Sequence, residues 1–183
     1  MKDYFSKIMM FNASFAPLYL MLLINQFNYC LSNMTKWSVV VFLFLMIFLM
    51  ILATVTNLRM IFFRGTREVE LNDNYKLIGD NIVSYIVTYL IPFMTLDLRN
   101  LPSVISNLLL FSLIASLYVR YDLEYLNPIL GLAGYRVFVS TGDGRATIIT
   151  RISADKLKQM KDNNIVVKKK VIVSDVFLIK PVD

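Results

Sequence analysis

Two patterns of hydrophobic residues divide this chain. Residues 38–57 contain no charged side chain, and residues 39–53 contain no polar side chain at all. A helix of about 20 apolar residues matches the roughly 30 Å hydrocarbon core of a bilayer. We therefore predict a membrane-spanning helix over residues 37–58.

Further apolar segments bounded by charges predict three more spans, near residues 13–30, 81–98 and 103–120. The segment near 81–98 is the shortest, because only sixteen residues separate Asp80 from Asp97 and Pro92 lies among them. A half-buried hairpin is an alternative for this segment. The fold class predicted for residues 1–125 is thus a membrane all-α domain of four transmembrane helices.

Beyond residue 125 the pattern changes to short alternating segments. Asn127-Pro128 and two nearby glycines mark the boundary. Ser153 is expected to cap a helix whose Ala154, Leu157 and Met160 share one face. Four strands are predicted, at residues 135–140, 146–152, 165–173 and 176–180, the first two joined by a hairpin turn at 141–144. Residues 126–183 therefore predict a small basic cytoplasmic α+β domain.

Residues 67–71, between the second and third predicted spans, alternate as well. They predict either a short strand that pairs with the C-terminal domain or a solvated linker.

Lys and Arg are distributed asymmetrically about the predicted spans. With the N-terminus inside, seventeen of the nineteen lie on the inner side and only Lys36 and Arg99 on the outer side. Such an excess marks the cytoplasmic side of a membrane protein. We expect a multi-pass protein with both termini in the cytoplasm and outer loops limited to residues 31–36 and 97–102.

The composition argues against enzyme chemistry. The chain is 57% hydrophobic and 17% charged, with no histidine and one cysteine, Cys30. A histidine base for nucleophilic catalysis is missing, and so is a ligand set for zinc, haem or an iron–sulfur cluster. We expect a protein that is not an enzyme and carries no cofactor.

Basic residues of the C-terminal domain are candidates for contact with a partner. The domain has ten Lys and Arg against five acids, a net charge of +5. Anionic lipid or an acidic protein surface would be contacted by Arg136, Arg151, Lys168, Lys169 and Lys170. For the three lysines, the favoured interpretation is protection of an edge strand against aggregation. A patch this short argues against direct binding of nucleic acid.

Two pairs in the last hairpin are candidates for contacts between helices or subunits. Asp97 and Arg99 in the second outer loop would pair with each other or across a subunit boundary, or remain a solvated pair of little energetic value. Ser112 and Ser116 form a small-xxx-small motif, which lets a second helix approach closely within the chain or between copies. Homo-oligomerisation is therefore expected.

The layout of four spans, short outer loops and a basic tail resembles a known family. The tail opens with Asn127-Pro-Ile-Leu-Gly-Leu-Ala-Gly-Tyr-Arg-Val-Phe138, continues with Ile148-Ile-Thr-Arg151 and closes with Val173-Ser-Asp-Val-Phe-Leu-Ile179. These features resemble the KwaA family, the membrane component of bacterial Kiwa anti-phage systems. The resemblance implies a homo-oligomeric inner-membrane sensor of phage attachment or injection. It also implies a cytosolic partner, KwaB, that carries the effector activity against phage DNA processes.

Two functions are favoured over a third, an accessory subunit of a membrane-bound enzyme. The first is a membrane sensor and scaffold that recruits or regulates a cytosolic effector through its C-terminal domain. The second is an oligomeric channel or pore-forming effector, for which the amides of Asn25, Gln26 and Asn28 would supply a polar lining. The same amides can instead join helices by hydrogen bonds, as polar groups in membrane helices commonly do.

Overall fold

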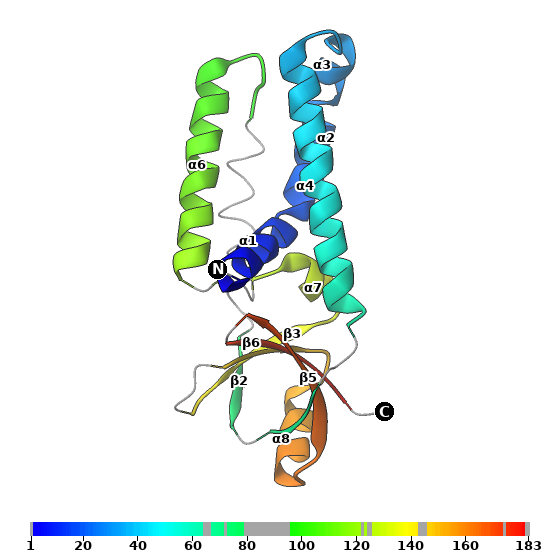
Figure 1. Ribbon diagram of the computed structural model, residues 1–183, viewed down its shortest axis with the longest axis vertical. Helices are drawn as coiled ribbons and strands as arrows, with labels where there is room; N and C mark the ends of the chain where they lie inside the picture. Colours follow the sequence, from blue (N-terminus) through cyan, green and yellow to red (C-terminus); the bar gives the residue numbers. More distant parts are fainter. Residues whose placement is uncertain are drawn as a thin grey trace.

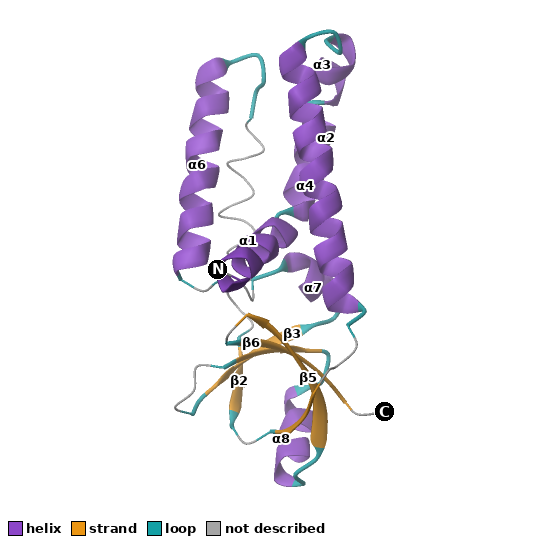
Figure 2. Cartoon of the chain, in the orientation of Figure 1, coloured by secondary structure: helices purple, strands orange, loops and turns teal. Residues whose placement is uncertain are grey.

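The computed structural model describes residues 2–63, 67–71, 73–78, 96–121, 123, 126–142, 146–173 and 175–181. These residues form two tiers (Figure 1): long helices at one end and a strongly curved sheet at the other, with a short helix between them. Figure 2 shows the same division, with purple helices above orange strands and one helix beneath the sheet.

The helical tier contains five of the described helices, α1 (Lys2–Ser14), α2 (Ala16–Asn25), α3 (Phe27–Ser32), α4 (Trp37–Ile61) and α6 (Leu101–Arg120). Helices α4 and α6 agree with the predicted spans at 37–58 and 103–120, and both are long and apolar enough to cross a membrane. A third crossing follows if the bent pair α1 and α2 counts as one broken span. Most of the span predicted near 81–98 lies outside the described residues. A four-span fold is therefore not confirmed.

The segment of the span predicted near residues 13–30 is not one straight helix. The chain bends by 46° between α1 and α2, and it breaks again at Gln26 before α3. The first break has a covalent cause, because Pro17 in the first turn of α2 has no N–H to donate to the carbonyl four residues earlier. Helix α1 consequently runs obliquely across the foot of α4 and α6 (Figure 1).

The sheet tier confirms the predicted strands and helix of the C-terminal part. Its strands follow the order β1-β5-β6-β4-β3-β2, and every neighbouring pair is antiparallel except β4 and β6. Helix α8 (Ala154–Asp162) begins where expected, because the Ser153 hydroxyl accepts the Lys156 N–H. The strands are β1 (Arg67–Glu70), β2 (Tyr75–Leu77), β3 (Arg136–Ser140), β4 (Thr147–Thr150), β5 (Val166–Val173) and β6 (Val176–Pro181).

The segment at 67–71 is a strand and not a linker, and its position makes the sheet curl. β1 and β2 occupy opposite edges of the six-stranded sheet, yet only residues 71–74 separate them. A flat sheet of six strands would hold its edges about 24 Å apart. The chain from Glu70 to Tyr75 can span at most about 18 Å. The two edges must therefore approach each other, and the sheet rolls into an open half-barrel.

Both faces of the rolled sheet are covered. Side chains alternate along each strand, so Val137, Ile149 and Leu178 face the helical tier, where they pack with the ends of α1 and α4 and with α7 (Pro128–Leu132). Their neighbours Phe138, Ile148 and Ile179 face α8. A separate apolar core holds α1, α2, α4 and α6 together. The sheet is thus seated against the foot of the helices.

Candidate functional site: the joint between helices and sheet

The carbonyl freed by Pro17 begins a chain of buried hydrogen bonds. In an unbroken helix the Ala13 carbonyl would accept the N–H of residue 17. Here the Asn57 side chain on α4 donates its Nδ2–H to that carbonyl at 3.0 Å. Asn57 is only 4% exposed. The amide therefore supplies the donor that proline lacks, and it fixes the break of the first segment against α4.

The same amide connects the break to the sheet tier. The Asn57 Oδ1 accepts a hydrogen bond from the Nδ2 of Asn127, at 2.9 Å. Asn127 is 1% exposed, and its own Oδ1 accepts the N–H groups of Ile129 and Leu130 at 3.0 and 3.3 Å. These bonds cap α7, the helix that leads into β3. Two asparagine side chains therefore connect three elements that are distant in sequence.

A second set of contacts ties the C-terminal end of α4 to the sheet. The Tyr135 hydroxyl donates to the Ile61 carbonyl at 3.1 Å. Lys180 on β6 donates from Nζ to the carbonyls of Ile61 and Phe63, at 3.4 and 3.2 Å. The last carbonyls of a helix lack intrahelical donors and lie at the negative end of its dipole, where a cation is favourable. The sheet thus caps the helix.

Cations gather around these carbonyls. The Arg151 guanidinium lies 4.6 Å from the centre of the Tyr135 ring. The ammonium groups of Lys180 and Lys170 lie 4.6 and 6.0 Å from the centre of the Phe63 ring. Burial raises the pKa of Tyr135, and the Arg151 charge partly opposes that rise. We call Arg151, Lys170 and Lys180 the cation cluster.

The structure divides the predicted basic contact residues between the two sheet faces. Lys170 faces the helices, whereas Lys169 faces α8, with its ammonium 3.5 Å from the centre of the Phe177 ring. Desolvation by burial lowers the pKa of Lys169. Lys168 stands opposite Glu68 and Lys180 in the sheet.

The other predicted basic residue, Arg136, is exposed. By strand alternation it belongs to the face of Phe138, which packs toward α8. The favoured interpretation of the three consecutive lysines, protection of a sheet edge, is wrong. β5 lies between β1 and β6, so neither of its sides is an edge.

The outer-loop pair joins other groups. The Asp97 carboxylate accepts the backbone N–H of Arg99 at 2.9 Å, and the Asp97 N–H donates to the Ser103 hydroxyl at 3.1 Å. The Arg99 guanidinium lies 5.3 Å from the centre of the Tyr29 ring, with the Lys36 ammonium 5.8 Å from the same centre. Cation–π contacts therefore bring Lys36 and Arg99 to one ring on α3.

Ser112 and Ser116 lie on an exposed side of α6. Each hydroxyl donates 2.8 Å to the carbonyl four residues earlier in the same helix. Packing within the chain uses a different face of α6, with Ile114 and Tyr118 buried. Both serines are exposed, and Ser116 also lines a cavity that α6 shares with α1, α2 and α4.

The amide cluster of the first segment is divided in a similar way. Gln26 is buried and donates to the Leu96 carbonyl, so it links the first segment to the loop before α6. Asn25 and Asn28 are exposed.

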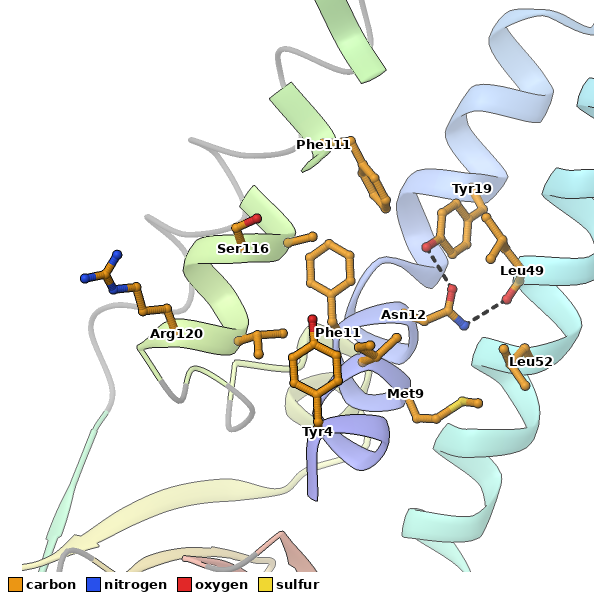
Figure 3. A pocket seen from close by; sticks show the side chains of 13 residues that line it. Tyr4, Met9, Phe11, Asn12, Tyr19, Leu49, Leu52, Phe111, Ser116 and Arg120 are labelled. Atoms are coloured by element: carbon orange, nitrogen blue, oxygen red, sulfur yellow. Dashed lines mark hydrogen bonds between the residues drawn. The ribbon is translucent and has the colours of Figure 1, made fainter. Parts of the chain in front are cut away.

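A cavity of about 520 Å³ lies among α1, α2, α4 and α6 (Figure 3). Asn12 is polar and buried in its wall, but it donates to the Leu49 carbonyl at 3.1 Å and accepts from the Tyr19 hydroxyl at 2.8 Å. The remaining wall is mainly apolar. The cavity therefore offers space for an apolar group, with Tyr4, Ser116 and Arg120 as further polar residues of its wall. Across the described ranges, no three His, Cys, Asp or Glu side chains converge as metal ligands.

Sequence reasoning named Asn127, Arg151 and Lys170, but it did not identify Pro17, Asn57 and Lys180 as parts of a joint. Pro17 was visible as a helix breaker, and Asn57 as an amide at the end of an otherwise apolar span. A signal for their connection would have been the unmet Ala13 carbonyl, but its partner becomes apparent only once α1 and α4 are placed side by side.

Comparisons with known proteins identify the family of this chain. A family model described as anti-phage protein KwaA matches residues 6–178. The Kiwa protein KwaA of Escherichia coli O55:H7 (strain RM12579 / EPEC) is 30% identical over 80 residues. That match covers 42% of this chain and 41% of the relative, less than half of either protein. No solved structure matches. Because the family model extends over nearly the whole sequence, this chain belongs to the KwaA family of anti-phage proteins.

Proposed function

We propose that this protein is a sensor and scaffold of the bacterial inner membrane within a Kiwa defence system. Its helices respond to a disturbance of the bilayer, and its sheet tier recruits or regulates a cytosolic effector of the KwaB type. Helices α4 and α6 have the length and apolarity that crossing requires, and the positive charge of the tail favours a cytoplasmic position.

The observation that carries the proposal is the hydrogen-bonded joint. A bilayer disturbance changes a protein only by stabilising one of two arrangements more than the other. The break at Pro17 is a place where two arrangements can differ, because its freed carbonyl is held by a side chain of α4 and not by its own helix. Asn57 and Asn127 continue that connection to α7 and β3. A change of the angle between α1 and α2 would therefore be transmitted to the sheet.

The effector would bind on the side of the sheet tier that faces away from the helices. Helix α8 lies there and exposes Lys156, Lys158 and Gln159, while Leu157 and Met160 point into the core. A charged exposed face suits a contact with an acidic protein surface.

The test measures recruitment and signalling separately. The full chain is co-expressed with its neighbouring Kiwa component, and partner yield after membrane extraction is measured together with phage plating. Lys156→Glu with Lys158→Glu should lower both partner yield and protection, whereas Lys36→Glu at the other end of the molecule is the matched control for partner yield. Pro17→Ala should keep partner yield but lose protection. Full protection in Pro17→Ala would contradict a sensing role of the break.

The oligomeric channel remains the second candidate. Gln26, the buried member of the amide cluster, already donates to the Leu96 carbonyl, which weakens the case for a polar lining. Reconstituted protein should therefore leave planar bilayers silent under voltage and tension. A sustained current that depends on the protein would replace the scaffold proposal.

A further inference from the structure

We propose that the cation cluster Arg151, Lys170 and Lys180 binds the phosphate of an anionic phospholipid in the inner leaflet. The inference rests on the proposed function in one respect, namely that α4 crosses the membrane with the sheet tier on the cytoplasmic side. It adds a ligand site that fixes the height of the sheet against the bilayer.

The end of α4 and Lys180 lie at the bilayer depth of the lipid phosphates. Helix α4 has 25 residues and is about 37 Å long, whereas the hydrocarbon core is about 30 Å thick. If the uncharged stretch 38–57 fills that core, Ile61 lies about 6 Å beyond it. The headgroup layer is about 5–7 Å thick on each side. The Ile61 carbonyl, and the Lys180 ammonium 3.4 Å from it, therefore lie at the depth of lipid phosphates.

Three cations from separate parts of the chain lie near the end of α4. The cluster members come from three separate parts of the chain, β5, β6 and the turn after β4, yet all surround the end of α4. Lys180 uses two of its donors on the carbonyls of Ile61 and Phe63. The described contacts of Lys170 and Arg151 are to ring faces, which leave their N–H donors oriented by packing and available to phosphate oxygens.

The positive charge of the cluster exceeds the negative charge described near it. On the face of the sheet that carries Lys170, the acids of the neighbouring strand are Glu68 and Glu70, both exposed. Glu68 stands directly opposite Lys168, which is why Lys168 is left out of the site. Lys169 and Arg136 belong to the other face and are also left out. The remaining cluster has three positive charges, and the partial negative charge of the α4 terminus offsets only a fraction of one.

The same geometry selects a lipid over an acidic protein. A protein partner would have to enter the headgroup layer beside the membrane-crossing helices to reach Lys170. A phospholipid already occupies that layer and presents one phosphate to donors that converge from several directions.

The experiment compares lysine labelling in nanodiscs that contain the full chain. An amine-reactive acylating reagent is applied with phosphatidylcholine alone and with about 30% phosphatidylglycerol added, and rates are read by peptide mass spectrometry. Anionic lipid should slow labelling of Lys170 at least threefold, and 0.5 M salt should remove the effect. Lys156 and Lys158 on α8 are internal controls and should not change. Equal rates at Lys170 in the two lipids would overturn the proposal, whether both are fast or both are slow.

A second arm identifies the source of the phosphate. Inorganic phosphate at 10 mM is added to the phosphatidylcholine nanodiscs, and it should leave Lys170 labelling unchanged. Protection by free phosphate equal to that by phosphatidylglycerol would assign the cluster to a soluble anion and overturn the lipid site.

Variants keep the proposal testable without chemical labelling. Arg151→Gln with Lys170→Gln should retain several-fold less phosphatidylglycerol in native mass spectrometry than the wild type. Lys156→Gln with Lys158→Gln makes the same change of charge on α8 and should retain as much as the wild type. Equal retention by the two double variants would contradict the site. A wild-type chain that retains phosphatidylglycerol but captures no partner would reject the scaffold function while leaving this inference standing.

Discussion

At the scale of single residues, the architecture depends on polar side chains that replace missing backbone partners. Asn57 supplies a donor to a carbonyl that proline deprives of its own, and Lys180 supplies donors to carbonyls at a helix end. Buried backbone groups without partners are costly, more so in the bilayer position that we propose for the helical tier. These few side chains therefore decide where the helices are held.

Asn57→Ala should destabilise the protein by about 2 kcal/mol or more. The change leaves the Ala13 carbonyl and the Asn127 Nδ2 group without their present partners, and each unsatisfied buried group costs about 1–3 kcal/mol. Denaturant unfolding in detergent measures the effect. Asn28→Ala, at an exposed position of the same residue type, is the control and should change stability by less than about 0.5 kcal/mol.

Tyr135→Phe should make stability less sensitive to alkaline pH. Burial raises the folded-state pKa of Tyr135, so the stability that its neutral hydroxyl contributes is present below the unfolded-state pKa of about 10. That contribution is lost as the pH rises through the higher folded-state pKa, because ionisation removes the donor to the Ile61 carbonyl. Melting temperatures between pH 8 and pH 11 should fall more steeply for the wild type than for the variant. Parallel curves would show that the hydroxyl is not linked to folding.

At the scale of elements, the sequence predicted what depends on local pattern. α4, α6 and the C-terminal strands follow from apolar length and alternation, and α8 follows from its cap at Ser153. The break at Pro17 was missed because length and apolarity alone suggested a continuous helix, although the proline lies within the predicted span. The position of β5 inside the sheet was missed because its neighbour β1 comes from a distant part of the chain.

Pro17→Ala tests whether the break and Asn57 depend on each other. Alanine restores an N–H that competes for the Ala13 carbonyl, so the helix should straighten and Asn57 should lose part of its role. In a double-mutant cycle, Asn57→Ala should therefore cost at least 1 kcal/mol less in the Pro17→Ala background than in the wild type. Additive costs would mean that the two residues act independently.

At the scale of the whole molecule, both faces of the sheet are covered, and its joint with the helices is both apolar and hydrogen-bonded. The helical tier exposes large apolar side chains along α4 and α6, as expected for a surface that lipid covers. This division between an apolar helical surface and a charged sheet tier supports the proposed topology.

Labelling of single cysteines in intact cells tests that topology. In a Cys30→Ser background, Met34→Cys near the outer loop should react with a membrane-impermeant maleimide, whereas Lys158→Cys on α8 should react only after the inner membrane is opened. Both side chains are exposed, so access and not burial determines the result. Reaction of Lys158→Cys in cells with a sealed inner membrane would reverse the orientation.

The pairing of β1 with β5 has a consequence for the order of synthesis. Arg67 on β1 pairs opposite Lys169 on β5, so the partner of this strand is made about 100 residues later. At about 5–20 residues per second, the ribosome needs roughly 5–20 s to reach it. Throughout that interval β1 is tethered to the end of α4 with its final neighbour still unmade. Biogenesis of the protein thus includes a waiting period that no local folding step can shorten.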